Sequence, residues 1–352
     1  MTMAAPWLDE TLKEVSRSFY KTVRVLPGAV RPQIGLAYLL ARATDTLADT
    51  EAVPVSERLA ALEALRARIE GAGTGRLDFT PFLSTAAVQA GPRPGVATAG
   101  ERRLLTRIEG ALDLLGTFAR SDQDLIRELL RVITSGQELD VRRFGRAPAV
   151  GGAPAAPEVV ALRTDAELED YIHRVAGCVG EFWTRICRAH LFPEARLDEA
   201  WLIERGVRFG KGLQLVNVLR DLPRDLRAGR CYLPEDRLAE AGLRPADLLE
   251  ASSLGRLRPC YDAYLDRAAA CLEAGWAYTN ALPRGQVRVR LACAWPILIG
   301  VRTLSLLRRG QVLEPGARIK VTRPEVRRLL FNSVVCYGWP AAWDRLFQSA
   351  RR

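Results

Sequence analysis

The chain reads IGLAYLLARATDTLAD from residue 34 to residue 49, an apolar run of helical length that ends in two aspartates. A spacing of four residues puts Asp45 and Asp49 on the same side of a helix, one turn apart. Two like charges at this spacing repel each other. A divalent cation such as Mg2+ removes that repulsion, because it takes oxygen ligands and keeps phosphate oxygens in its shell. The stretch therefore predicts a helix that can hold a metal–diphosphate complex.

A second stretch, GLQLVNVLRDLPRD at residues 212–225, repeats the pattern with Asp221 and Asp225. A single pair of this kind on a solvent-exposed helix is common and is weak evidence for a metal site. Here both pairs leave apolar helices, where carboxylates are costly to desolvate unless they are paired or bound to metal. Arg42 and Arg220 flank the pairs, close enough along a helix to meet a phosphate. We therefore expect the two pairs to face each other and to cage a diphosphate through metal ions.

Periodic apolar segments of helical length recur along all 352 residues, and runs of β-branched residues are scarce, so the sequence predicts an all-α protein. Two segments rich in Gly, Ala and Pro, near residues 71–100 and 145–157, indicate flexible insertions. Neither insertion isolates a half with a complete site, so we expect a single domain over residues 1–352. Helices are predicted at about residues 6–14, 31–49, 55–71, 101–119, 122–142, 165–192, 195–222, 245–252, 257–281, 285–309 and 323–331.

Composition narrows the class of protein. The net charge of +10 suits nucleic acid, anionic lipid or phosphorylated small molecules, but the basic residues lack the aromatic interleaving of an RNA platform, so no nucleic-acid partner is predicted. Seven cysteines without a CxxC pair indicate reduced thiols, and two histidines are too few for a zinc site. We see no signal peptide and no apolar span long enough to cross a bilayer. The sequence therefore predicts a cytoplasmic protein that can rest on a membrane surface.

Several polar positions allow two interpretations. Ser16-Arg17-Ser18 can clasp a phosphate or simply cap a helix. Gln214 and Asn217 continue the side of Asp221 as a polar stripe, facing either solvent or a cavity. Three further features are ambiguous or weaker. Tyr38 lies on the same side of its predicted helix as Asp45. Gln137 and Asp140 form a second, smaller polar stripe. Gly177 and Gly180 leave room for either a neighbouring helix or an apolar substrate tail.

The segment from residue 313 to residue 324, LEPGARIKVTRP, lies between the last two predicted helices. It is basic and contains helix breakers, which suits a mobile flap over a site. Its composition fits an ordinary charged turn equally well.

Together these blocks resemble the squalene and phytoene synthase family: Ser16 to Phe19, Asp45 to Asp49, Tyr171 to Gly180 and Gln214 to Asp225 match its signature segments in order. The likeness runs from about residue 10 to residue 310. It implies the all-helical isoprenoid-synthase fold, a bundle around a central cavity. It also implies head-to-head joining of two prenyl diphosphates through a cyclopropylcarbinyl diphosphate.

The resemblance also implies roles for single residues. Asp45, Asp49, Asp221 and Asp225 would hold Mg2+, and Tyr171 would assist proton removal, with pyrophosphate as a competing base. Val175 to Gly180 would line the tunnel for the prenyl chains. Lys320 and Arg323 resemble the basic flap that contacts NADPH in squalene synthases. The positions expected at the diphosphate are Ser16, Arg17, Ser18, Tyr38, Arg42, Gln214, Asn217, Arg220 and Arg230.

The chain departs from the family pattern at Arg174, a position that is often aromatic, and at Arg224, where eukaryotic squalene enzymes often carry an acid. The segment from Gly229 to Pro234 looks more like phytoene and bacterial members. The absence of a C-terminal anchor resembles a bacterial squalene synthase. We expect that two farnesyl diphosphates are joined through presqualene diphosphate to squalene, with reduction by NADPH. The alternatives are a phytoene, dehydrosqualene or presqualene diphosphate synthase, which would lack the reductive step, and a non-catalytic scaffold relative.

Overall fold

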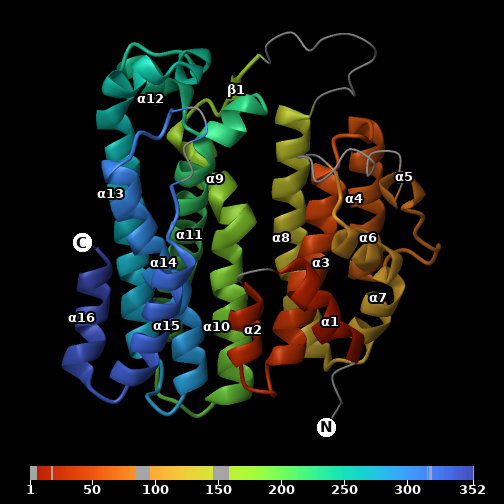
Figure 1. Cartoon of the computed structure of the whole chain (residues 1–352). Helices are drawn as coiled ribbons and strands as arrows, with labels where there is room; N and C mark the ends of the chain where they lie inside the picture. Colours follow the sequence, from red (N-terminus) through yellow and green to blue (C-terminus); the bar gives the residue numbers. More distant parts are fainter. Residues whose placement is uncertain are drawn as a thin grey trace. The chain divides into compact units, whose positions relative to one another are not determined.

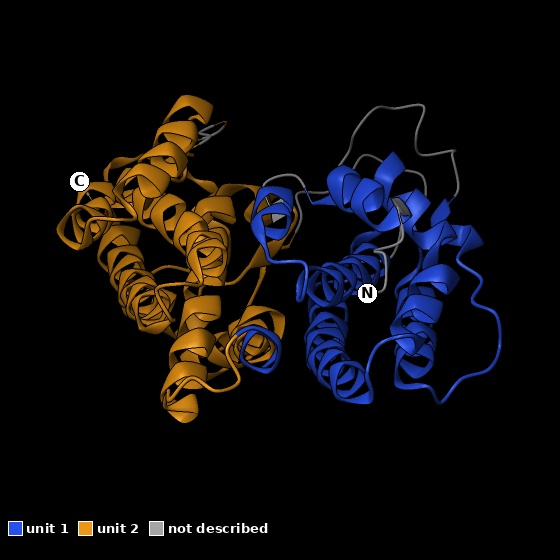
Figure 2. Cartoon of the chain, turned by 90° about the horizontal axis from the view of Figure 1, so that it is seen from below, with its two compact units in different colours: residues 1–154, 185–191 blue, residues 155–184, 192–352 orange. Residues whose placement is uncertain are grey.

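The computed structural model describes residues 6–16, 19–83, 96–145, 158–314, 316 and 319–351, which fold almost entirely into helices (Figure 1). The exception within these residues is a two-residue parallel pair, β1 (Val160–Ala161) with β2 (Arg230–Cys231). The predicted all-α class is therefore confirmed. The chain divides into two compact units, residues 1–154 with 185–191 and residues 155–184 with 192–352 (Figure 2).

Unit 1 is built around α3 (Arg31–Asp49), which packs against the long helix α8 (Arg120–Phe144) and against five shorter helices. Leu36, Leu39, Leu40 and Leu47 of α3 are fully buried, so this helix is a core element. Burial of its apolar side chains fixes which way the remaining polar side chains point. The other helices of this unit are α1 (Pro6–Val15), α2 (Phe19–Val25), α4 (Val55–Glu70), α5 (Thr80–Leu83), α6 (Ala99–Thr106) and α7 (Ile108–Gly116).

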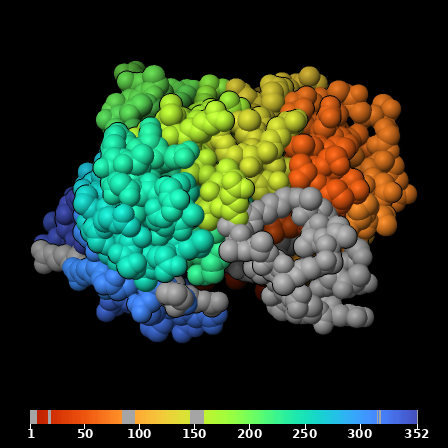
Figure 3. Space-filling model, turned by 90° about the horizontal axis from the view of Figure 1, so that it is seen from above, coloured from red at the N-terminus to blue at the C-terminus, as the bar shows by residue number. Residues whose placement is uncertain are grey.

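Unit 2 is built around α11 (Glu199–Arg227), which packs along α13 (Leu254–Ala281) and touches α14 (Val287–Arg309). The segment from β2 to the turns before α13 makes a continuous surface, teal in Figure 3. The remaining elements are α9 (Asp165–Ile172), the π-helical turn η2 (His173–Gly177), α10 (Cys178–Leu191, whose last seven residues belong to unit 1), α12 (Glu235–Glu240), the 3-10 turns η3 (Pro245–Leu249) and η4 (Ala251–Ser253), α15 (Arg323–Cys336) and α16 (Pro340–Ala350).

Glycines let α11 approach its neighbours closely. A Cβ atom on Gly180 would lie 1.8 Å from the carbonyl oxygen of Gly206, and one on Gly210 would lie 2.2 Å from that of Ala176. Both distances are far below contact, so the backbones themselves are packed against each other. Of the two interpretations of the glycines around η2, helix packing therefore explains Gly180.

Most predicted helices are present, with several corrections. The helix predicted at 101–119 is two helices that meet at Arg107, and the one predicted at 245–252 is the pair of 3-10 turns η3 and η4. The predicted helices do not include the short helices α2, α12 and α16, and α5 lies in the insertion predicted near residues 71–100. Parts of the two predicted insertions, residues 84–95 and 146–157, lie outside the described residues.

One helix in the described residues, α14, is long and apolar enough to cross a membrane by length and composition. In this structure 72% of its apolar window is buried inside the protein. Cys293, Ile297 and Leu298 are at most 1% exposed, so α14 is a core helix of unit 2.

Candidate active site

The first carboxylate pair lies at the C-terminal end of α3, in unit 1. Arg42, one turn before Asp45 on the same helix, donates from Nη1 to Asp45 Oδ2 at 2.5 Å and from Nη2 to Glu101 of α6. Its remaining nitrogen, Nε, is buried and has no hydrogen-bond partner. Arg42 therefore holds two carboxylates and keeps one further donor for another acceptor.

Asp45 lies within electrostatic reach of three further carboxylates. Burial, together with the nearby charges of Asp49, Glu101 and Asp140, raises the pKa of Asp45 to about 7 against the opposing effect of Arg42. Asp45 nevertheless keeps 38% of its side-chain surface exposed, so the carboxylate is crowded but reachable from solvent. A cluster of this kind gains stability when a cation enters it.

Hydrogen bonds and a neighbouring cation lower the pKa of Glu101. Burial alone would raise its pKa, but the Thr98 backbone N–H, at 2.7 Å from Oε2, and the guanidinium of Arg42 outweigh burial and lower it. Thr98 and Glu101 form a capping box at the start of α6. We did not predict Glu101, although the T-x-x-E capping pattern at residues 98–101 can be read from the sequence.

Ser16 and Tyr38, both expected at the diphosphate, donate hydrogen bonds to backbone carbonyls in this structure. Ser16 is buried and its hydroxyl donates to the carbonyl oxygen of Leu12, so it closes the end of α1 in this structure. Tyr38 donates a long hydrogen bond of 3.4 Å to the carbonyl of Val15. Arg17 and Ser18 lie outside the described residues.

The second carboxylate pair lies near the end of α11, in unit 2. Arg220 binds Asp221 through two parallel hydrogen bonds, Nε to Oδ1 at 2.9 Å and Nη2 to Oδ2 at 2.7 Å. Arg224 contacts Asp225 at 3.1 Å. Burial, together with the charge of Asp221, raises the pKa of Asp225 to about 6 against the opposing effects of Arg224 and Arg230. Three arginines therefore act on the two aspartates of this pair.

Pro223 lies between these two aspartates, and yet the helix continues to Arg227. Proline has no N–H, so the carbonyl of Leu219, four residues earlier, loses its helical donor. The buried hydroxyl of Tyr261 on α13 donates to this carbonyl at 2.9 Å instead. Tyr261 thereby keeps Asp221 and Asp225 on one continuous helix, a role that the sequence analysis missed.

Tyr171, on α9, lies beside the polar stripe of α11. Its ring stacks on Tyr232 with centroids 4.7 Å apart, and its hydroxyl accepts a long hydrogen bond of 3.4 Å from Gln214. Asn217 donates to Gln214 at 3.3 Å. The structure therefore brings together three predicted residues, and it adds Tyr232 to them.

Arg230 is positioned by the short β pair. Gly229, two residues after the last residue of α11, adopts a left-handed conformation with φ of 76°, and its carbonyl accepts from the N–H of Val160 at 3.0 Å. Arg230 then pairs with Val160 in register and acts electrostatically on Asp225. The predicted arginine thus belongs to the second carboxylate pair.

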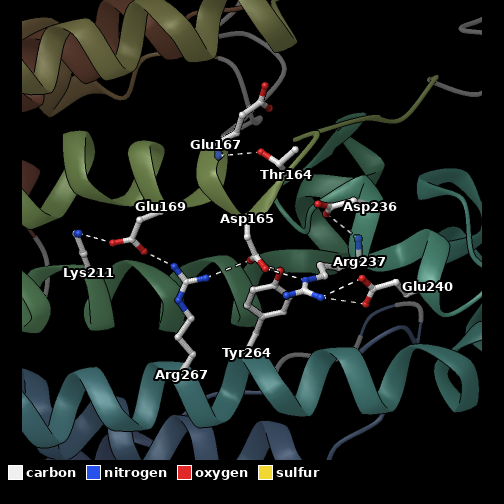
Figure 4. A network of polar contacts seen from close by, with 10 residues as sticks. All are labelled: Thr164, Asp165, Glu167, Glu169, Lys211, Asp236, Arg237, Glu240, Tyr264 and Arg267. Atoms are coloured by element: carbon white, nitrogen blue, oxygen red, sulfur yellow. Dashed lines mark hydrogen bonds and ion pairs between the residues drawn. The ribbon is translucent and has the colours of Figure 1, made fainter.

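A polar network fixes α9 against α11 and α13 (Figure 4). Glu169 binds both Lys211 and Arg267, and Arg267 also reaches Asp165 at 3.2 Å. Asp165 accepts from the hydroxyl of Tyr264 at 2.6 Å and pairs with Arg237 of α12 at 2.8 Å. Because Tyr171 follows Glu169 by two residues, this network fixes the helix that carries it.

Lys320 and Arg323 are exposed, and no hydrogen bond or ion pair recorded among the described residues joins either side chain to the residues above. Arg323 opens α15, whose first turn is closed by a capping box between Thr322 and Glu325. Pro315, Ala317 and Arg318 of the predicted flap lie outside the described residues.

The two aspartate pairs suit hard divalent cations, because each pair offers carboxylate oxygens from neighbouring turns of its own helix. Among the described residues, no group of three or more His, Cys, Asp or Glu side chains by itself completes a metal-binding cluster. Ligands from outside the chain, such as phosphate oxygens, would therefore have to complete the shell.

Comparison with known proteins places the chain in one family. Residues 12–325 match the squalene/phytoene synthase family model. The chain is 29% identical over 271 residues to presqualene diphosphate synthase from Rhodopseudomonas palustris, which covers 77% of each protein. It is also 29% identical over 250 residues to bifunctional lycopene cyclase/phytoene synthase from Blakeslea trispora. That match covers 71% of the chain and 36% of the fungal protein, so the chain spans about a third of that relative's length.

Structural similarity supports the same fold. A solved complex of TcSQS with a ligand superposes with a TM-score of 0.75 over 98% of this chain and 89% of that one, at 20% identity. The predicted isoprenoid-synthase fold and the resemblance are both confirmed. The chain therefore belongs to the squalene/phytoene synthase family, whose members are head-to-head prenyltransferases.

Proposed function

We propose that this protein joins two molecules of farnesyl diphosphate, through presqualene diphosphate, to squalene, using Mg2+ and NADPH. Family membership makes it a prenyltransferase that acts on prenyl diphosphates, and members of the family use a divalent metal to bind the diphosphate. The substrate length, the metal and the reductive step are proposals. The observation that carries them is the pair of arginine-bound aspartate turns, one on α3 and one on α11.

In this proposal the two turns share one diphosphate site. Asp45 and Asp49 would hold metal ions from one side, and Asp221 and Asp225 would hold them from the other. Bound Mg2+ would neutralise the charge that develops on the departing diphosphate. The buried and unpartnered Nε of Arg42 supports a role in this site, because it is a donor that lacks an acceptor.

The arginines of the second turn would act on the same leaving group. Arg220 and Arg230 are preorganised by Asp221 and by the β pair, so they need no rearrangement when charge develops. Stabilising charge that appears only on ionisation lowers the barrier instead of merely tightening substrate binding. We include Arg17, Ser18 and Ser16 in the proposed diphosphate contacts on the resemblance alone. In the present structure the hydroxyl of Ser16 would first have to leave Leu12.

Tyr171 is proposed to assist proton removal during closure of the cyclopropane ring. Its hydroxyl accepts from Gln214, and its ring is held flat against Tyr232. Gln214 and Asn217 would orient this hydroxyl. Departing pyrophosphate is the competing base.

NADPH is proposed to bind at Lys320 and Arg323. Both side chains are exposed cations, and phosphate groups of the cofactor would suit them. Bound NADPH would supply the hydride that reduces the rearranged cation. This part of the proposal rests on charge and exposure.

The main alternative stops at presqualene diphosphate. It is favoured by the likeness to presqualene diphosphate synthases from Rhodopseudomonas palustris and Sinorhizobium fredii, which are 29% identical to the chain. In that case the chain would lack a functional hydride-donor site, and Lys320 and Arg323 would be surface residues of a turn.

Product analysis by mass spectrometry separates these functions. The purified protein is incubated with farnesyl diphosphate and Mg2+, with and without NADPH, and in parallel with geranylgeranyl diphosphate. Squalene that forms only with NADPH supports the proposal, whereas presqualene diphosphate as the end product in both reactions supports the alternative. A C40 product from the longer substrate would overturn the proposed chain length.

A further inference from the structure

Large apolar side chains are concentrated on the outside of α15 and the turn after it. Phe331 is 68% exposed, Val334 54%, Val335 48% and Trp339 65%. These four residues fall within nine consecutive positions, and Phe331 and Trp339 are the two most exposed large apolar side chains among the described residues. A cluster of this kind marks a binding surface more often than scattered apolar residues do.

The orientation of α15 is fixed by contacts on its opposite side. Ser333 is fully buried and accepts a hydrogen bond of 3.0 Å from the indole Nε1 of Trp295 on α14. With about 100° of rotation per residue, Phe331 and Val335 lie nearly opposite Ser333. At the end of the helix, the hydroxyl of Tyr337 donates to the carbonyl of Arg284 at 2.6 Å. The exposed side chains therefore cannot turn inward without breaking these bonds.

Arginines border this surface. Arg327 and Arg328 are exposed and lie one turn before Phe331, on either side of the line from Phe331 to Val335. From Arg323 to Arg352 the sequence contains six arginines against only two acids, Glu325 and Asp344. The α15 surface, defined as Phe331, Val334, Val335 and Trp339 with Arg327 and Arg328, therefore combines an apolar centre with a basic margin.

We propose that the α15 surface is a docking site for an anionic phospholipid bilayer. A helix that lies in the plane of a membrane inserts apolar and aromatic side chains among the acyl chains and directs arginines to the phosphates. Tryptophan is favoured at this depth because its ring is amphipathic. The arginines at the margin favour an anionic membrane as the partner, because a purely apolar partner would not need positive charge around the contact. The proposal does not depend on which prenyl product the enzyme forms.

Co-sedimentation with lipid vesicles tests this proposal, using the full chain. We expect the protein to bind phosphatidylcholine vesicles that contain phosphatidylglycerol, to bind pure phosphatidylcholine vesicles at least tenfold more weakly, and to lose affinity as the salt concentration rises. Phe331→Ser combined with Trp339→Ser should lower the partition coefficient more than tenfold. Arg327→Ala and Arg328→Ala should each lower it about fivefold, and only with the anionic vesicles.

Matched controls come from the same chain. Leu139→Ser removes an apolar side chain that is 48% exposed, as Val335 is, and Arg120→Ala removes an arginine whose side chain is 80% exposed. Neither control should change vesicle binding, and circular dichroism should show that all variants are folded. Equal binding to both vesicle types, or vesicle binding unchanged in the Phe331/Trp339 variant, would overturn the proposal. A change in sedimentation coefficient of that variant without lipid, with vesicle binding intact, would assign the surface to a second copy instead.

Discussion

The two aspartate turns use the same four-residue spacing but have different electrostatic surroundings. On α3, the charges of Asp49, Glu101 and Asp140 raise the pKa of Asp45, and the charge of Arg42 opposes them. On α11, Asp221 and Asp225 face Arg220, Arg224 and Arg230. The charges that act on Asp45 are mostly negative, whereas those that act on Asp225 are mostly positive. A repeated motif in the sequence therefore does not imply two equal metal sites.

We therefore expect the two turns to have different roles, one mainly in binding metal and the other mainly in binding phosphate. The turn on α3 needs cations from solution to relieve its repulsion, so it should dominate metal binding. The turn on α11 already carries guanidinium groups, which are the better partners for a phosphate that arrives with a metal.

The largest expected effect is on catalysis. Asp45→Asn and Asp225→Asn should each lower kcat/KM for farnesyl diphosphate by about a thousandfold, because each removes charge that holds a metal at the leaving group. Steady-state kinetics at saturating Mg2+ measures this loss. Asp344→Asn, at an exposed position of α16, is the control and should retain full activity. A loss of less than tenfold in either variant would remove that turn from the active site.

Metal dependence should distinguish the two turns. We expect Asp45→Asn to raise the half-saturating Mg2+ concentration about tenfold and Asp221→Asn to raise it about threefold, since the charges that act on Asp45 are mostly negative and those that act on Asp225 are mostly positive. The measurement is initial rate against Mg2+ concentration at a fixed substrate concentration. Equal shifts, or a larger shift for Asp221→Asn, would show that the arginines around α11 do not substitute for metal.

The geometry of the second turn should depend on Tyr261. Tyr261→Phe removes the donor to the carbonyl of Leu219, and leaving a buried carbonyl without a partner costs about 1–3 kcal/mol. We expect the melting temperature to fall by about 2–4 °C for each kcal/mol. Activity should fall as well, because Asp225 lies beyond Pro223 on the same helix.

Tyr20→Phe serves as the matched control for this substitution, since the hydroxyl of Tyr20 makes an exposed hydrogen bond of 3.1 Å to Asp9. It should change stability little. An unchanged melting temperature in Tyr261→Phe would mean that water or a shift of the helix replaces the hydroxyl.

The smallest effect concerns pH and the network in Figure 4. Burial alone would raise the pKa of Asp165 and of Glu169, but their hydrogen bonds and cationic neighbours outweigh it and lower both below the ordinary values of 3.8 and 4.5. The unfolded chain therefore binds protons at a higher pH than the folded protein does. The stability that these groups contribute is present above the ordinary values and is lost as the pH falls through the folded values.

Urea unfolding at a series of pH values below 5 tests this expectation. Glu169→Gln should reduce the dependence of the unfolding free energy on pH, whereas Glu10→Gln, at an exposed residue of α1, should leave it unchanged. An identical dependence in Glu169→Gln and the unsubstituted protein would show that the network contributes no proton linkage.

The sequence predicted the helices and the two aspartate turns because both depend on local spacing. Apolar periodicity places α3 and α11, and a four-residue interval places two carboxylates on one side. The contacts of Glu101 with Arg42, of Tyr232 with Tyr171 and of Tyr261 with Leu219 could not be assigned in this way. Each residue meets its partner across a tertiary contact, and no local pattern reports which carbonyl or ring lies opposite.

Helix ends show the same limit. The break at Arg107 and the 3-10 turns η3 and η4 replace predicted continuous helices, since apolar periodicity alone does not specify where a helix stops. Pro223 favours an earlier end for α11 than the structure has, and the hydroxyl of Tyr261 supplies the hydrogen bond that the carbonyl of Leu219 loses there.

The most direct test of the account is a double-mutant cycle between the two aspartate turns. Binding of Mg2+-diphosphate is measured by calorimetry for the unsubstituted protein, Asp45→Asn, Asp225→Asn and the double variant. If both turns hold one shared metal–diphosphate cluster, either single substitution should lose nearly as much binding free energy as the double variant, so the coupling between them should be at least about 1 kcal/mol. Losses that simply add would mean that the two turns act as separate sites, and would contradict the account.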